Sequence, residues 1–158
     1  MSHQTTDLKI IHKAVCIYFN LELIDLFKRT RKRKILVPRQ WFHYLSRELN
    51  PKYLLSLNEI GCYFEFATND SWDHASIIHS CKQISGHIDF YKESKETKVK
   101  LLELIEIKVK SLGVEYIWTW TAAYEGLAFY LKQGYKSFTE FDNFYPSGHA
   151  RVGVIKKL

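Results

Sequence analysis

The sequence predicts an α+β protein in which a helical first part is followed by a short β-α-β-β segment. Up to about residue 112 the apolar residues recur at helical spacing, whereas Val114–Thr121 is rich in β-branched and aromatic residues. Hydrophobic residues make up 46% of the 158 residues and aromatic residues 15%, which is enough for a packed core.

The first part is expected to contain several helices. Ile11, Val15 and Tyr18 lie at helical spacing in the first of them. Pro38 is expected in the first turn of the third helix, where a missing N–H group is tolerated. The basic run before Pro38 has no apolar face and is predicted to be a loop. The expected helices are residues 8–19, 22–27, 38–49, 54–64 and 73–84.

The fourth and fifth of these helices have the pattern of a helix-turn-helix. Ser56 and Glu59 form a capping box, and Gly61 lies where a neighbouring segment would approach closely. A polar stretch separates this helix from residues 73–84, which open with polar and small side chains. Two short helices joined by a polar turn predict a helix-turn-helix.

The second part begins with a long helix. This helix is expected from Glu93 to Leu112, with Gly113 as its C-terminal cap. A strand, an amphipathic helix at 122–133 and two further strands complete the segment. The change in composition predicts two domains, residues 1–95 and 96–158.

Positive charge is concentrated in one place. The formal net charge is +6, and residues 28–34 contain six cationic side chains: Lys28, Arg29, Arg31, Lys32, Arg33 and Lys34. Such a cluster indicates a polyanionic partner. A solvated run of surface charge is the plainer alternative.

Several classes of site are not indicated. Cys16, Cys62 and Cys81 are scattered and form no CxxC pair, so no disulfide framework and no metal site is predicted. The sequence has no apolar run long enough to span a bilayer and no secretory leader, so a cytoplasmic, nucleoid-associated location is expected and no membrane partner. It also lacks the GxxxxGK[ST] phosphate-binding pattern, and no cofactor is predicted.

The order of these motifs resembles a known family. Three motifs follow the basic run in sequence: VPRQ at 37–40, LNEIG at 57–61 and DHAS at 73–76. Residues 8–90 thereby resemble the C-terminal DNA-binding domain (domain IV) of the bacterial replication initiator DnaA, a Trp-repressor-like helix-turn-helix fold. Trp72 replaces an arginine of that family, and the loops at 50–55 and 65–72 are longer.

The resemblance implies a set of DNA-binding residues. The recognition helix would read base edges from its first turn, and Arg31 would enter the minor groove. Neighbouring cations would bind phosphates, while residues of the third helix would contact the backbone or a base. The implied residues are Arg29, Arg31, Arg33, Lys34, Arg39, Gln40, Arg47, Asp73, His74, Ala75 and Ser76. The plainer alternative is that Asp73 only caps the helix and His74 is a surface histidine.

Residues 101–158 resemble the C-terminal half of a Gcn5-related N-acetyltransferase (GNAT). The carrying text is AFYLKQGY at 128–135 with the strands around it. The glycine-containing loop that binds the coenzyme pyrophosphate is absent before the long helix, and Tyr130 is expected to be a packing residue. A half sheet of this kind would expose apolar surface, which allows a protein partner or self-association through this segment.

The sequence therefore predicts a protein that binds double-stranded DNA at specific, DnaA-box-like sites. The resemblance links it to replication initiation or its regulation, without ATPase activity and without enzymatic function. The alternative is an acetyl-CoA-dependent N-acetyltransferase. Duplex binding and coenzyme A binding distinguish the two hypotheses.

Overall fold

The computed structural model describes residues 3–49, 55–63 and 71–158. The chain divides into two compact units, Met1–Ile105 and Glu106–Leu158. Helix α6 (Lys92–Ser111) is continuous through residue 95, where the sequence indicates a domain boundary, so the chain passes from one unit to the other inside this helix. The predicted α+β class is confirmed, because the first unit is helical and the second contains an antiparallel sheet.

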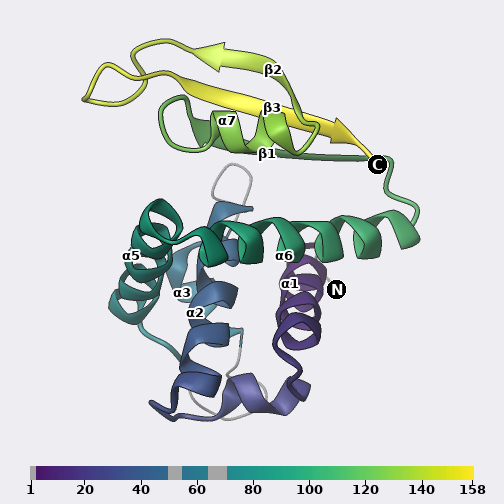
Figure 1. The fold of residues 1–158 in the computed structure, drawn as a ribbon, viewed down its shortest axis with the longest axis vertical. Coiled ribbons are helices and arrows are strands. Elements are labelled where there is room, and N and C mark those ends of the chain that lie inside the picture. Colours follow the sequence, from purple (N-terminus) through teal and green to yellow (C-terminus); the bar gives the residue numbers. More distant parts are fainter. Residues whose placement is uncertain (1–2, 50–54, 64–70) are drawn as a thin grey trace. The chain divides into compact units, whose positions relative to one another are not determined.

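The first unit is a helical bundle with α2 at its centre. Helix α2 packs against α1 and α5, and Figure 1 shows it between them. Its Phe42 and Leu45 are buried, and burial of one such side chain stabilises the fold by roughly 1.5–3 kcal/mol. The helices of this unit are α1 (His3–Phe19), the 3₁₀ helix η1 (Leu23–Phe27), α2 (Arg33–Glu48), α3 (Leu57–Cys62), α5 (His74–Phe90) and the first part of α6.

The start of α2 differs from the sequence prediction. The helix begins at Arg33 rather than near Pro38, so Arg33 and Lys34 lie in its first turn and Pro38 lies inside it. The basic side chains in this turn point to solvent, and Ile35 is the first buried residue. A first turn needs no apolar face of its own, which is why periodicity did not reveal it. Pro38 removes the bond that its N–H would have donated to the Lys34 carbonyl, and its ring crowds that carbonyl.

The helix-turn-helix prediction is confirmed in α3 and α5, which pack against each other. The capping box is present, because the Glu59 backbone N–H donates to Ser56 Oγ at 3.2 Å and the Ser56 N–H donates to Glu59 Oε2 at 2.6 Å. Helix α5 extends to Phe90, six residues beyond its predicted end. Most of the two longer loops, at 50–55 and 65–72, lies outside the described residues.

Buried polar contacts fix the helices of the first unit. His12 Nδ1 lies 3.2 Å from the Tyr63 hydroxyl and its Nε2 lies 3.0 Å from the Leu23 carbonyl oxygen, which ties α1 to η1 and to the end of α3. The buried Lys98 ammonium on α6 donates to Glu48 and to the Tyr44 hydroxyl, each at 2.9 Å. Cys16 and Cys81 are buried free thiols, and Cys62 is half-buried.

The second unit is a three-stranded antiparallel sheet with the order β1-β3-β2. Along the chain, the elements follow the predicted β-α-β-β order: β1 (Tyr116–Ala122), helix α7 (Leu127–Lys132), β2 (Lys136–Phe141) and β3 (Arg151–Lys157). Helix α7 covers one face, where Val152 and Val154 are buried (Figure 1). Gly113 and Gly134 adopt positive φ and end α6 and α7, as their spacing predicts for Gly113.

The end of α6 is bonded to this sheet. Glu106 accepts hydrogen bonds from the Tyr135 hydroxyl at 2.9 Å and from Lys156 Nζ at 2.6 Å. Burial and the neighbouring Glu106 carboxylate raise the pKa of Tyr135 well above its usual range. Within the described part of the chain, no helix is both long and apolar enough to cross a lipid bilayer.

Candidate nucleic-acid interface

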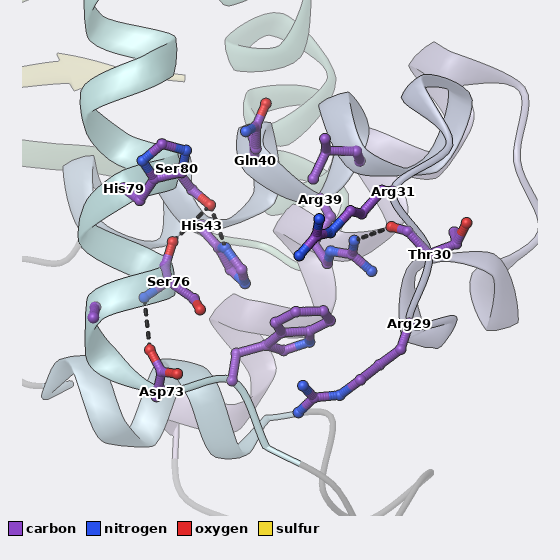
Figure 2. Close-up of a pocket in the computed structure, with 13 residues that line it drawn as sticks. Arg29, Thr30, Arg31, Arg39, Gln40, His43, Asp73, Ser76, His79 and Ser80 are labelled. Carbon is purple, nitrogen blue, oxygen red and sulfur yellow. Dashed lines mark hydrogen bonds between the residues drawn. The ribbon is translucent and has the colours of Figure 1, made fainter.

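A groove with a volume of about 730 Å³ lies on the first unit between the basic loop, defined here as residues 28–32, and the start of α5. Figure 2 shows Arg29, Thr30 and Arg31 on one side and Asp73, Ser76, His79 and Ser80 on the other, with α2 residues between them. Two segments that lie about forty residues apart in the sequence thus form the two walls of one groove. The lining residues are Arg29, Thr30, Arg31, Leu36, Arg39, Gln40, His43, Trp72, Asp73, Ala75, Ser76, His79 and Ser80.

Most residues that the sequence nominated for DNA binding line this groove. They are Arg29, Arg31, Arg39, Gln40, Asp73, Ala75 and Ser76. Arg33 and Lys34 are exposed in the first turn of α2, and His74 is exposed in the first turn of α5, outside the lining. Arg47 is exposed in the last turn of α2, about two helical turns beyond Gln40. The structure therefore brings the loop and the helix start together and leaves Arg47 apart from them.

Asp73 is the N-cap of α5. Its Oδ1 accepts a hydrogen bond from the Ser76 backbone N–H at 2.7 Å, and this bond lowers the pKa of the exposed carboxyl group. The cap fixes where the helix begins, so His74 and Ala75 occupy its first two positions with exposed side chains. The capping role of Asp73 is thus present in the structure, and the first turn of α5 is open to a ligand.

Arg39 holds the basic loop in place. Its side chain is only 3% exposed, and its two terminal nitrogens donate to the carbonyl oxygens of Lys28 at 2.5 Å and Thr30 at 2.8 Å. Burial, with the nearby charge of Arg29, lowers the pKa of Arg39 to about 10, which leaves it charged at neutral pH. A guanidinium that bridges two loop carbonyls sets the backbone conformation on either side of Arg29.

Trp72 supports the same loop through its ring. The guanidinium carbon of Arg39 lies 4.1 Å from the centroid of the Trp72 ring, and that of Arg29 lies 4.4 Å from it. Arg29 also donates to the Ser71 carbonyl oxygen at 2.5 Å. Both ring distances fall well inside the range of cation–π attraction. In the sequence, Trp72 is notable only because it replaces an arginine of the resembled family. In the fold, its ring contacts and orders two other cationic side chains, Arg29 and Arg39.

Gly61 makes this position of Trp72 possible. The Trp72 backbone N–H donates to the Gly61 carbonyl oxygen at 3.2 Å. A Cβ atom on Gly61 would collide with the Trp72 carbonyl oxygen and would approach Ile77 Cδ1 within 3.3 Å. The predicted close approach at Gly61 is confirmed, and its neighbour is the backbone that carries the arginine-binding ring.

His43 lies beneath the groove in a buried hydrogen-bond chain. Ser80 Oγ donates to the Ser76 carbonyl oxygen at 2.9 Å, so its single hydrogen is used and His43 Nδ1, 3.0 Å away, is the donor to Ser80. His43 Nε2 is then an unprotonated acceptor, and it has no partner within the described residues. Burial lowers the pKa of His43 to about 3, with Arg39 acting in the same direction, so the ring is neutral at physiological pH.

Sequence reasoning missed several lining residues, which are Thr30, Leu36, His43, Trp72, His79 and Ser80. His79 and Ser80 follow Ala75 and Ser76 by four residues on α5, so helical spacing places them on the same face. No comparable pattern identifies His43 or Trp72, because they join the groove through packing between segments distant in sequence.

Two other features bear on ligand binding. Tyr130 is fully buried and its ring packs against Phe129 and Tyr135, which agrees with the expected packing role. Among the residues that the structure describes, no group of three or more His, Cys, Asp or Glu side chains is placed to hold a metal ion.

Comparison with known proteins gives matches to the helical unit. Residues 8–84 match the family described as "Bacterial dnaA protein helix-turn-helix". The chromosomal replication initiator protein DnaA of Ehrlichia ruminantium (strain Gardel) is 38% identical over 88 residues, which are 56% of this chain and 17% of that protein. The DnaA of Thermoanaerobacter sp. (strain X514) is 38% identical over 115 residues, 72% of this chain and 23% of that protein.

A third relative gives a similar picture. The DnaA of Caldanaerobacter subterraneus subsp. tengcongensis is 33% identical over 112 residues, 70% of this chain and 22% of that protein. The chain thus spans about a fifth of the length of the curated relatives that it matches.

Proposed function

We propose that this protein binds specific sites in double-stranded DNA, because residues 8–84 match the family described as "Bacterial dnaA protein helix-turn-helix". The observation that carries the proposal is the groove, which joins the basic loop to the first turn of α5. One DNA strand lying in it would place the loop in the minor groove and α5 in the adjacent major groove. The basic loop and α5 would then contact the same duplex together.

In this arrangement the first turn of α5 reads base edges. Asp73 remains ionised because its pKa is lowered, so its carboxylate can accept from a cytosine amino group. The exposed His74 can donate to or accept from a base edge, and the Ala75 methyl can contact a thymine methyl. Ser76 can bond a base or a phosphate. These assignments are the base-reading part of the proposal.

The exposed Arg31 enters the minor groove, where a narrow A·T-rich segment has the most negative potential. Arg29 is held by Trp72 and Ser71 at the edge of the groove and contacts a phosphate. Arg39 acts by positioning the loop, since both of its terminal nitrogens are engaged with loop carbonyls. Gln40 lies on the buried side of the groove. Arg47 contacts the DNA backbone from the far end of α2.

The first turn of α2 supports a phosphate contact. Arg33 and Lys34 occupy a position where the helix dipole disfavours cations, and the N-cap Lys32 makes no side-chain capping bond. Local stability does not explain this choice of residues. A bound phosphate would turn this unfavourable arrangement of cations at a helix N-terminus into a favourable one, because the phosphate is attracted both to the cations and to the helix N-terminus.

The relatives are named as replication initiators, and we propose that this chain recognises DnaA-box-like sites and acts on replication initiation or its regulation. It would do so by occupying DNA rather than by hydrolysing ATP or transferring an acetyl group. The domains 1–95 and 96–158 would have separate roles, with the second available to a further partner. A nucleoid location follows from DNA binding.

A selection of bound duplexes from a random pool tests the proposal. The purified chain is expected to enrich one defined motif, and that motif is expected to be DnaA-box-like. Binding to that motif should exceed binding to a scrambled duplex at the same salt concentration, because affinity alone reports mainly phosphate contacts. Enrichment of no motif, with equal affinity for every duplex, contradicts sequence-specific binding.

A further inference from the structure

The sheet of the second unit has one covered and one open face. In antiparallel pairs, residues opposite each other point to the same side. Thr119, Thr121, Val152 and Val154 are at most 8% exposed and lie on the face covered by α7. The intervening positions of β1 and β3 point to the other face, and aromatic side chains concentrate there.

We define the aromatic face by its residues: Tyr116, Trp118, Trp120, Phe138, Phe141 and Phe144. Phe138 lies 6.3 Å from Trp118 and 6.0 Å from Trp120 between ring centroids, and Phe141 stacks on Trp120 at 5.5 Å. Tyr116, Phe138, Phe141 and Phe144 are each about half exposed, at 48–51%. Aromatic rings in contact with one another and with solvent form a continuous platform.

A glycine at the centre makes room for this platform. Gly153 is paired with Trp120 in register, and a Cβ at Gly153 would lie 2.7 Å from Phe138 Cζ. The β-bulge between Ser137 and Thr139 turns Phe138 onto this face. The ring of Phe138 therefore lies next to Gly153 of β3 and contacts Trp118 and Trp120 of β1.

The charged side chains at the paired strand positions of this face are positive. Arg151 lies 4.9 Å from the ring centroids of both Trp120 and Phe144, and Lys157 lies 5.9 Å from that of Tyr116. Lys136 is paired in register with Ile155 and shares the face. In the three strands, no acidic side chain occupies a paired position on this side, since Glu140 pairs with the buried Val152 of the other face.

From this juxtaposition of exposed rings and cations we infer that the aromatic face binds single-stranded DNA. Bases stack on the rings without requiring a particular sequence, and the cations bind the phosphates between them. A second copy of this chain fits the face less well, because a two-fold interface would bring the same cations against each other. The single-strand site would be separate from the duplex groove on the first unit.

Fluorescence anisotropy with a labelled oligothymidylate of about 15 nucleotides, long enough for one platform, tests the inference on the full chain. The double variant Phe141→Ser/Phe144→Ser is expected to weaken oligothymidylate binding by at least about fivefold, the lower end of the effect of removing one base–aromatic stack. Its affinity for the selected duplex should not change. Leu131→Ser, which removes a 48% exposed apolar side chain from α7, is the matched control and should retain both activities.

A second set of variants removes charge without touching the rings. Lys136→Gln and Lys157→Gln together should make oligothymidylate binding less dependent on salt, with the slope of log affinity against log salt falling by about 0.7 for each phosphate that the protein no longer neutralises. Both residues are exposed, so circular dichroism and thermal melting should match those of the parent protein. Arg31→Ala should weaken duplex binding and leave oligothymidylate binding intact.

Three results would overturn the inference. The first is unchanged oligothymidylate binding in the folded Phe141→Ser/Phe144→Ser and Lys136→Gln/Lys157→Gln proteins. The second is oligouridylate binding much tighter than oligothymidylate binding, which would assign the face to RNA. The third is a dimer in sedimentation that becomes a monomer in the aromatic variant without a change in oligothymidylate affinity, which would make the face a self-association surface.

Discussion

The guanidinium carbon of Arg39 lies 4.1 Å from the centroid of the Trp72 ring, and the same side chain bonds two carbonyls of the basic loop. Trp72 directly precedes the N-cap of α5. This pair therefore connects the basic loop to the start of α5. Changes at Trp72 should affect both walls of the groove.

Trp72→Ala is expected to weaken binding to the selected duplex by about 1–2 kcal/mol, since it removes the cation–π contacts to Arg29 and Arg39. Trp72→Phe retains an aromatic face and should recover most of the affinity. Titration of a labelled duplex with each variant measures the effect. Equal affinity of Trp72→Ala and the parent protein would show that the loop is ordered without the ring.

Trp72→Arg introduces the residue type found in the resembling family. It should weaken binding rather than strengthen it, because the new cation would lie beside the guanidinium groups of Arg29 and Arg39 and repel them. The measurement is the same titration, with Trp72→Gln as the control for removal of the ring alone. An affinity of Trp72→Arg above that of the parent protein would contradict the positioning role of Trp72.

Arg31→Ala is expected to reduce specific duplex affinity by about 1–3 kcal/mol, the usual effect of removing a specific arginine contact. Lys9→Ala on α1 removes the same charge from an exposed position outside the groove and should change affinity far less. Both proteins are to be titrated at one physiological salt concentration. If the two variants lose affinity equally, Arg31 contributes only through net charge.

Gly61→Ala should lower the free energy of unfolding by about 1–3 kcal/mol, because its Cβ meets the Trp72 carbonyl oxygen, a backbone atom that cannot rotate away. Gly86→Ala on α5 is the matched control. No heavy atom lies within 4 Å of a Cβ at Gly86, so the alanine should stabilise by about 0.5–1 kcal/mol. Urea denaturation of both variants measures the difference, and a neutral Gly61→Ala would show that the segment at Trp72 can shift.

Acid should destabilise the first unit through His43. An imidazole in the unfolded chain titrates near pH 6.5, whereas folded His43 stays neutral down to about pH 3. Between these values only the unfolded chain binds this proton, so the free energy of unfolding falls as pH decreases, by up to about 1.4 kcal/mol per pH unit. Burial lowers the pKa of His12 as well, which acts in the same direction.

Urea denaturation of the parent protein and of His43→Gln at several pH values below 6.5 isolates this contribution. The variant should show a shallower decrease in unfolding free energy toward acid, whatever its stability at neutral pH. Parallel pH profiles for the two proteins would mean that His43 does not remain neutral in the fold.

Local sequence determined most helix boundaries and caps. The capping box at Ser56 and Glu59 and the cap at Asp73 involve residues three positions apart, so the pattern predicts them without the fold. Gly113 and the β-α-β-β order follow from similarly short patterns. The basic run and the helix-turn-helix were visible for the same reason.

Tertiary structure decided what the remaining site residues do. Arg39 and Trp72 are 33 positions apart, and only packing of α2 against α5 brings them together, so the sequence nominated Arg39 as a DNA contact and undervalued Trp72. Burial between segments that are distant in the sequence makes His43 neutral. The register of strands that are distant in the sequence assembles the aromatic face. Short-range patterns specify the caps and many of the element ends, whereas contacts between elements specify the environment of each side chain.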